Sequence, residues 1–448
     1  MKRRAFLSSG AAGLGLLAGC SAESGTDQQT PSDTPVRTQT DGSTATGTAS
    51  QTPRDNPDTI FVAPSGIDNA PGTRDEPLET IQRALIRVRP GETVHVFPGR
   101  YERPVETVRS GTAVDPITVT GPPDAVFNAD GPFEINHDHI HLRGLTFDGL
   151  HTPTAPDDPD AYAESLLQVN ERFYETIKSG ERGADPVPDE KYLTGVKVKP
   201  YAVGNCRADF IKIHWSKDVE IGEFKIIGPA GVKFLKGDAI GHNSEIIYLG
   251  NAPSKGYPPD QTRNVHIHHI DNSEGYAHSE LVDCKTGTSN VTIEYCTDAG
   301  GSAEAITDEG TESGLHIGGT DITVRWNVLA GGAEAGIEID SDIAATENPP
   351  ESYADGGTRN AIYGNHLLDN DGLALRFAYP DSQGQDAQRI ICGNEYNGQT
   401  HGEPDRSCTD EIPAGDSVGH TGGESTEGWF DGDELSRLTR SVQLSHSP

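Results

Sequence analysis

A short apolar unit of the form Val-x-Ile or Ile-x-Val recurs along the second half of the chain, at residues 265–267, 291–293 and 322–324. Single apolar residues hold the same place elsewhere, so that the series comprises Leu142, Ile221, Ile267, Ile293, Val324, Ile362 and Ile391. Short strands that return at such intervals predict a repeat architecture, because each unit buries its apolar face only against its neighbours. This recurrence constrains the fold more than any other feature of the sequence.

A second apolar series runs in phase with the first. Its members are Ile211, Ile247, Val282, Leu315, Ile337 and Leu373. In three turns of the repeat (211 to 221, 282 to 293 and 315 to 324) the two series lie close together, without the helical periodicity that a β-α-β crossover needs. We therefore expect an all-β fold, a single-stranded right-handed parallel β-helix. A β-propeller is the alternative, but its units need about four strands each.

An asparagine stands three residues beyond each of the last three members of the first series, as Asn327, Asn365 and Asn394. A residue of this type at a fixed corner predicts stacked side chains that bond to the backbone. Asparagine also tolerates left-handed backbone, which corners often need.

Residues 1–20 have the pattern of an export signal. Arg3 and Arg4 precede an apolar stretch that is too short to span a bilayer as a helix, and the stretch ends in Leu-Ala-Gly-Cys20. The segment resembles a twin-arginine signal that ends in a lipobox, in which Cys20 would be lipidated. An ordinary signal peptide with an incidental cysteine is the alternative. We expect an extracellular protein that is attached to the outer face of the cell membrane through this N-terminal lipid anchor alone.

Composition divides the rest of the chain. Residues 21–56 are Ser, Thr, Gln, Asp, Gly and Pro almost throughout, which predicts a flexible tether, and residues 411–448 form an acidic, mostly disordered tail. The β-helix is expected over residues 57–410. Residues 151–200 interrupt the repeat as an inserted loop, and the apolar spacing over residues 162–177 predicts a helix there. A loop of this size walls a cleft or forms a docking surface.

The formal net charge is −34. So acidic a chain is not expected to bind nucleic acid. The charge is typical of a haloarchaeal-type secreted protein, whose carboxylate-rich surface remains hydrated in high salt. Five of the six cysteines lie beyond the signal. Cys392 and Cys408 could form a disulfide outside the cell, whereas Cys206, Cys284 and Cys296 are expected to pack inside the coils.

Strand alternation places the residues that follow each apolar anchor on the outside. For the second series these are Lys212, His214, Tyr248, Asp283, Lys285, His316, Glu338, Asp340 and Arg376. For the first series they are Arg143, Glu220, His266, His268, Thr292, Glu294, Thr323 and Arg325. Because adjacent coils lie about 4.8 Å apart, the former set would form one stripe. Its mixture of acids and bases is the composition that a polysaccharide cleft needs, with Lys212, His214 and Tyr248 as substrate-binding residues.

The N-terminal repeat region, residues 60–112, contains the turn motifs Pro71-Gly-Thr, Pro90-Gly-Glu-Thr and Pro98-Gly-Arg-Tyr. This run resembles the opening of right-handed β-helix polysaccharide lyases. The resemblance implies that residues 78–88 form an amphipathic helix that caps the open end of the coil stack, since an exposed sheet edge invites aggregation.

The segment Ser279-Glu280-Leu-Val-Asp283-Cys-Lys285 resembles the Glu-x-x-x-x-Lys strand of the chondroitinase-B and alginate-lyase family, and more distantly the lysine-base pectate lyases. The resemblance implies Ca²⁺ as cofactor, with Glu280 as ligand and Lys285 as base. Calcium bound to a uronate carboxylate makes the C5 proton more acidic, and a lysine close to that cation has a lowered pKa.

Two family positions differ in this chain. The family's second acidic ligand is replaced by His278, and the arginine of the following coil by His316, which could donate a hydrogen bond to substrate. Arg376 lies in Gly-Leu-Ala-Leu-Arg, which is similar to the family's arginine motif but occurs further along. Asp283, Glu338 and Asp340 are the other oxygen ligands expected for Ca²⁺.

The sequence thus predicts a Ca²⁺-assisted, β-eliminating lyase of acidic polysaccharide, with Lys285, His316 and Arg376 as catalytic residues. One alternative is a non-catalytic β-helix that binds a glycan or a partner. A second is a glycoside hydrolase that uses paired carboxylates such as Glu338 and Asp340. The histidines at 266, 268 and 269 resemble a ligand cluster, but strand alternation also accounts for them as surface residues, and no zinc-type spacing with cysteine accompanies them.

Overall fold

The computed structural model describes residues 58–180, 187–232, 244–300, 313–332, 335–340, 356–378 and 385–400. All of them belong to one compact unit, Gln51–Pro448. The predicted signal 1–20, tether 21–56 and tail 411–448 lie outside the described residues, and so do Cys20 and Cys408. No helix in the described part of the chain is long and apolar enough to cross a membrane.

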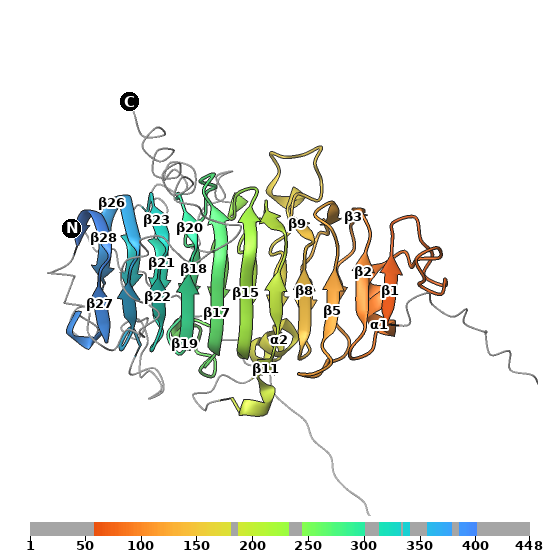
Figure 1. Ribbon diagram of the computed structural model, residues 1–448, viewed down its shortest axis with the longest axis horizontal. Coiled ribbons are helices and arrows are strands. Elements are labelled where there is room, and N and C mark those ends of the chain that lie inside the picture. Colours follow the sequence, from red (N-terminus) through yellow and green to blue (C-terminus); the bar gives the residue numbers. More distant parts are fainter. Residues whose placement is uncertain are drawn as a thin grey trace, which may run out of the picture. The chain divides into compact units, whose positions relative to one another are not determined.

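The described residues contain 28 strands, which stack coil upon coil as a right-handed parallel β-helix with three faces (Figure 1). The first face consists of β4 (Val105–Glu106), β7 (Phe133–Ile135), β10 (Leu167–Val169), β14 (Ile211–Ile213), β16 (Ile247–Leu249), β18 (Val282–Cys284), β21 (Ser313–Ile317), β24 (Ala335–Ile339) and the second half of β26 (His366–Phe377).

The second face consists of β1 (Thr59–Val62), β2 (Thr93–Val96), β5 (Ile117–Thr120), β8 (Ile140–Arg143), β12 (Lys197–Lys199), the first halves of β15 (Ser216–Ile226) and β17 (Arg263–Asn272), β19 (Ser289–Glu294), β22 (Thr323–Arg325), β25 (Ala361–Tyr363) and β27 (Ile390–Cys392). The short strand β11 (Leu193–Thr194) pairs with the start of β15.

The third face consists of β3 (Gly99–Tyr101), β6 (Ala125–Phe127), β9 (Thr146–Asp148), β13 (Ala202–Gly204), the second halves of β15 and β17, β20 (Thr297–Asp298), β23 (Val328–Ala330), the first half of β26 and β28 (Glu395–Thr400). All of these named strand pairs are parallel, as the absence of helical crossovers between the series predicts.

The core consists of inward columns of apolar side chains. On the second face the column is Leu142, Val198, Ile221, Ile267, Ile293, Val324, Ile362 and Ile391. On the first face it is Phe133, Leu167, Ile211, Ile247, Val282, Leu315, Ile337 and Leu375. The sequence expectation of Leu373 in this column is wrong by two residues: Leu373 pairs with Ala335, and Leu375 with Ile337.

The three predicted asparagines form a buried ladder. The Nδ2 of Asn327 donates to the Oδ1 of Asn365 at 3.0 Å, and the Nδ2 of Asn365 donates to the Oδ1 of Asn394 at 2.9 Å. The left-handed residue at this corner is not the asparagine but its predecessor, for example Trp326 with φ of 55°. The asparagine thus ties coil to coil while the preceding residue turns the chain.

The helix that the N-terminal motifs imply as a cap is α1 (Ile81–Arg87), which buries Ile81, Ala84 and Leu85 against the first coils. The Thr80 side chain caps its N-terminus by accepting a hydrogen bond from the Arg83 N–H at 3.1 Å. Figure 1 shows α1 beside β1 and β2 at one end of the stack.

The segment 151–200 contributes strands β10, β11 and β12 to the coils, as well as a helix. The helix predicted over residues 162–177 is shorter and later, α2 (Glu171–Ser179), because Leu167 and Val169 belong to strand β10. Short 3-10 turns lie at Pro159–Ala161, Asp189–Lys191, Pro253–Lys255 and Gln385–Ala387. Phe173, Tyr174 and Ile177 of α2 pack against a cluster that contains the fully buried Trp215.

Candidate active site

A row of polar side chains, here called the polar column, runs along the outside of the first face. Strand register makes its members direct neighbours on consecutive coils: Lys212, Tyr248, Asp283, His316, Glu338 and Arg376. Gln168 and Glu134 continue the column toward the N-terminus. The predicted stripe is therefore present in the structure.

Lys285 lies one pleat beyond Asp283, and the neighbouring coils carry glycines at the same level. The Lys285 N–H donates to the carbonyl that precedes Gly250, and the Gly318 N–H donates to the carbonyl that precedes Lys285. With no side chain on either flank at this level, the Lys285 side chain extends back over the polar column. Its Nζ lies 2.6 Å from the Oδ2 of Asp283 and 5.3 Å from the centre of the Tyr248 ring.

A row of buried acids runs beside the polar column. Asp209, Glu245 and Glu280 each stand two residues before an inward anchor, and each is at most 5% exposed. Backbone hydrogen bonds that connect Phe210 to Glu245 and Ile246 to Glu280 place the acids on consecutive coils. Stacked carboxylates in a buried setting need a cation or a proton, because like charges repel strongly where water is excluded.

Three carboxylates converge at this point. Glu245, Glu280 and Asp283 each have an oxygen within 4.8 Å of the other two. The Oε2 of Glu245 is buried and has no hydrogen-bond partner among the described residues. Burial, and next the Asp209 carboxylate, raise the pKa of Glu245 well above its ordinary value. A set of oxygen donors with an unused buried acceptor fits Ca²⁺, which binds six to eight oxygens.

Cationic groups surround this acid cluster. The Lys212 Nζ lies 2.9 Å from the Oδ2 of Asp209, and the His316 Nδ1 lies 2.8 Å from the Oδ1 of Asp283. Burial alone would raise the pKa of Asp283, but Lys285 and His316 outweigh it and lower the pKa to about 2. Burial alone would lower the pKa of His316, but the Asp283 carboxylate raises it well above the ordinary value.

Two of the expected metal ligands, Glu338 and Asp340, are not members of the three-carboxylate group. Glu338 lies 3.4 Å from the Nη1 of Arg376, and Asp340 lies 3.5 Å from the Nε2 of His316. The structure thus places Glu280 and Asp283 together, but with Glu245 instead of Glu338 and Asp340. Strand alternation does not predict Asp209 and Glu245 as site residues, because a residue two positions before an inward anchor is itself expected to point inward.

His214 is not available to a substrate as the sequence suggests. It is 3% exposed, and its ring stacks on Tyr174 of α2 with centroids 4.4 Å apart. Strand alternation places His214 on the outside of the coil, but helix α2 covers it. His278 is also buried, and its Nε2 lies 2.9 Å from Asp298, away from the three carboxylates. The expected burial of the thiols of Cys206, Cys284 and Cys296 is confirmed, and Cys392 is disulfide-bonded.

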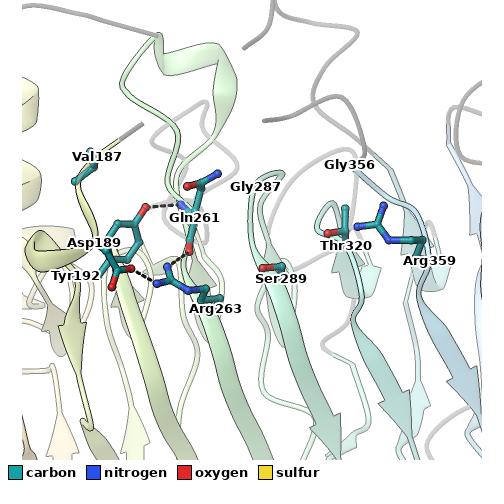
Figure 2. Close-up of a pocket in the computed structure, with 10 residues that line it drawn as sticks. All are labelled: Val187, Asp189, Tyr192, Gln261, Arg263, Gly287, Ser289, Thr320, Gly356 and Arg359. Atoms are coloured by element: carbon teal, nitrogen blue, oxygen red, sulfur yellow. Dashed lines mark hydrogen bonds and ion pairs between the residues drawn. The ribbon is translucent and has the colours of Figure 1, made fainter. Parts of the chain in front are cut away.

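A hollow of about 380 Å³ lies at the corner between the first and second faces. Figure 2 shows Arg263 and Arg359 on opposite sides of it, with Ser289 and Thr320 between them. Arg263 pairs with Asp189, and Arg359 pairs with Asp321. None of the three converging carboxylates lines this hollow, so the polar column remains the stronger candidate.

Comparison with known proteins agrees with this fold. The solved alginate lyase from Paenibacillus sp. str. FPU-7 has a TM-score of 0.51 and 16% identity, covering 78% of this chain and 99% of that one. The chain therefore has the right-handed parallel β-helix fold found in polysaccharide lyases. A family model described as a protein of unknown function (DUF1565) matches residues 64–108.

Sequence similarity to curated proteins is local. Pectate lyase PEL9 of Emericella nidulans is 26% identical over 121 residues, which cover 26% of this chain and 25% of that protein. The uncharacterized protein YwoF of Bacillus subtilis is 30% identical over 105 residues, which cover 21% of this chain and 22% of that protein. The chain thus matches about a quarter of the length of these relatives.

Proposed function

We propose that this protein is a cation-assisted lyase that cleaves an acidic polysaccharide by β-elimination. The observation that carries the proposal is the contact between Lys285 and Asp283, which is one of the three converging carboxylates. Similarity to a pectate lyase and an alginate lyase favours a uronate-containing substrate.

The residues divide the work as follows. Glu245, Glu280 and Asp283 would hold Ca²⁺, which, when bound, supplies positive charge that acidifies the proton next to a uronate carboxylate. Lys285 takes that C5 proton. The C5–H electron pair then forms the C4–C5 double bond, the C4–O bond breaks, and the leaving oxygen is protonated from solvent. His316 and Lys212, on either side along the polar column, bind substrate oxygens.

Asp283 connects the side chains proposed to act on the substrate, Lys285 and His316, with the three-carboxylate group. Its carboxylate contacts both Lys285 and His316 and also belongs to the three-carboxylate group. A carboxylate engaged with a divalent cation interacts less with an ammonium group. Ligation by Asp283 would therefore free the Nζ of Lys285 to face the substrate.

One observation favours the alternative, a surface that binds glycan without cleaving it. Lys212, Lys285, His316 and Arg376 are each already paired with an acid of the same face. Such a network could serve binding alone. The location predicted by the N-terminal segment, the outer face of the cell membrane with a lipid on Cys20, is part of the proposal in either case.

The test measures the absorbance of unsaturated product with pectate, alginate and glycosaminoglycans in high salt, with and without Ca²⁺. We expect product from at least one polymer, its loss on chelation, and a fall in kcat on the order of a thousandfold for Lys285→Ala. Lys225→Ala, on the exposed third face, is the matched control and should retain activity.

Glycan binding without product from any of these polymers would establish the non-catalytic alternative. Product formation that survives Lys285→Ala would remove Lys285 from the mechanism. Activity that does not change on chelation would remove the cation.

A further inference from the structure

The second face carries its own convergence of ligand-type side chains, on the opposite side of a corner from the polar column. We propose that Glu220, His266 and His268 form a binding site for a divalent transition metal of the zinc class. This inference is independent of the proposed lyase activity.

Strand register builds the cluster. Glu220 of β15 is the direct neighbour of His266 of β17, and His268 follows two residues later on the same side of the strand. One ligand atom of each residue lies within 4.8 Å of the others, and the Nε2 of His268 is 3.4 Å from the Oε1 of Glu220. Two imidazoles and a carboxylate are donors that zinc-class metals prefer, whereas Ca²⁺ takes oxygen ligands.

A glycine makes the room for this approach. Gly222 is the neighbour of His268 on the adjacent strand, and a Cβ there would lie 1.9 Å from the His268 carbonyl oxygen and 3.2 Å from its imidazole. A side chain at that position would collide with the His268 backbone, so a glycine is needed for the two strands to lie this close together.

Each histidine also forms a hydrogen bond through one ring nitrogen to a neighbouring side chain, which orients the ring as is usual for histidines that bind metals. The Nδ1 of His268 lies 2.9 Å from the Nδ1 of His269, and the Nε2 of His266 lies 2.8 Å from the Oε1 of Glu294. A hydrogen bond between two Nδ1 atoms requires one of them to accept, so at least one ring is neutral.

Two lysines now neutralise Glu220. Lys197 Nζ is 2.7 Å from its Oε2, and Lys199 Nζ is 2.5 Å from its Oε1. Lys199 also pairs with Glu223 at 2.7 Å, so it keeps an anionic partner if it leaves Glu220. A metal ion would thus compete with the Lys199 ammonium for the carboxylate. The His266 side chain is 44% exposed, which leaves the site open to solvent.

The experiment uses the tag-free full chain after treatment with a chelator. Co²⁺ is titrated and followed by its visible absorbance, and Zn²⁺ is titrated by calorimetry and by the shift in Tm. We expect one equivalent of each ion to bind through this site and to raise Tm, with no such effect from Mg²⁺. His266→Gln should weaken the affinity at least roughly tenfold.

Two further variants sharpen the result. His141→Gln removes a histidine on the same face but outside the cluster, and it should leave affinity unchanged. Lys199→Met removes the competing cation, and it should tighten binding. The proposal is overturned if neither the wild type nor Lys199→Met binds Zn²⁺, or if binding and the Co²⁺ spectrum are unchanged in His266→Gln.

Discussion

The Asn365 side chain bonds to both neighbouring coils. It accepts hydrogen bonds from the backbone and side-chain amides of Asn327, and it donates to the Val324 carbonyl and to Asn394. We expect Asn365→Ala to lower the free energy of unfolding by about 3 kcal/mol, because the buried groups lose their partners. Urea unfolding followed by circular dichroism measures the change.

The control for this prediction is Thr292→Ala, at an outward position of the second face, where a change within roughly 0.5 kcal/mol is expected. Asn365→Asp is a second comparison, since it keeps the acceptor but cannot donate. If Asn365→Ala is as stable as the control, the ladder does not stabilise the stack.

Among the elements, α1 depends most visibly on a single cap. The Thr80 hydroxyl accepts from the Arg83 N–H, and Asp68 accepts from both the backbone and the hydroxyl of Thr80. Thr80→Ala should lower the free energy of unfolding by about 1 kcal/mol, because the Arg83 N–H and the Asp68 carboxylate lose the Thr80 hydroxyl as their hydrogen-bond partner. Thr80→Ser retains the hydroxyl and should restore most of the loss in the same urea measurement. Equal destabilisation by both variants would show that the methyl group, not the cap, matters.

At the scale of the whole molecule, the net charge of −34 opposes compaction. Salt screens this repulsion, and it also weakens exposed ion pairs such as Arg207 with Asp160. Because exposed pairs contribute at most about 1 kcal/mol each, the repulsion should dominate. We therefore expect Tm to rise as KCl increases from about 0.1 M to 1 M, because the Debye length falls from about 10 Å to about 3 Å over this range.

Sucrose at matched osmolarity is the control for the salt prediction, since it strengthens burial without screening charge. A Tm that falls with KCl would mean that local ion pairs, not net repulsion, set the electrostatic contribution. It would also remove the physical basis for the expected adaptation to high salt.

Much of the fold follows from the apolar spacing, because a strand that slips by one residue would expose its whole inward column. Ile211 and Ile247, for example, had to align, and Lys212 and Tyr248 followed them to the outside. The register of Leu373 was misjudged because β26 runs without a break around a corner and places two leucines, Leu373 and Leu375, two residues apart on the first face.

The candidate site was less predictable for a different reason. Asp209 and Glu245 are acids in an acidic chain, and only their stacking at one level of consecutive coils distinguishes them from surface carboxylates. The covering of His214 depends on how Tyr174 packs, which is a tertiary contact with no signal in strand alternation. Lys285 was recognisable because its spacing from Glu280 is specific.

The asparagine ladder has a consequence for how this molecule can change length. Asn327 and Asn365 are 38 residues apart and make equivalent bonds to the coil that follows each of them. A tandem duplication of that stretch would add one rung and about 4.8 Å of height, and every older rung would keep its partners. Growth by whole coils is thus a nearly neutral event for this architecture, whereas a duplication that does not comprise a whole coil would break the ladder.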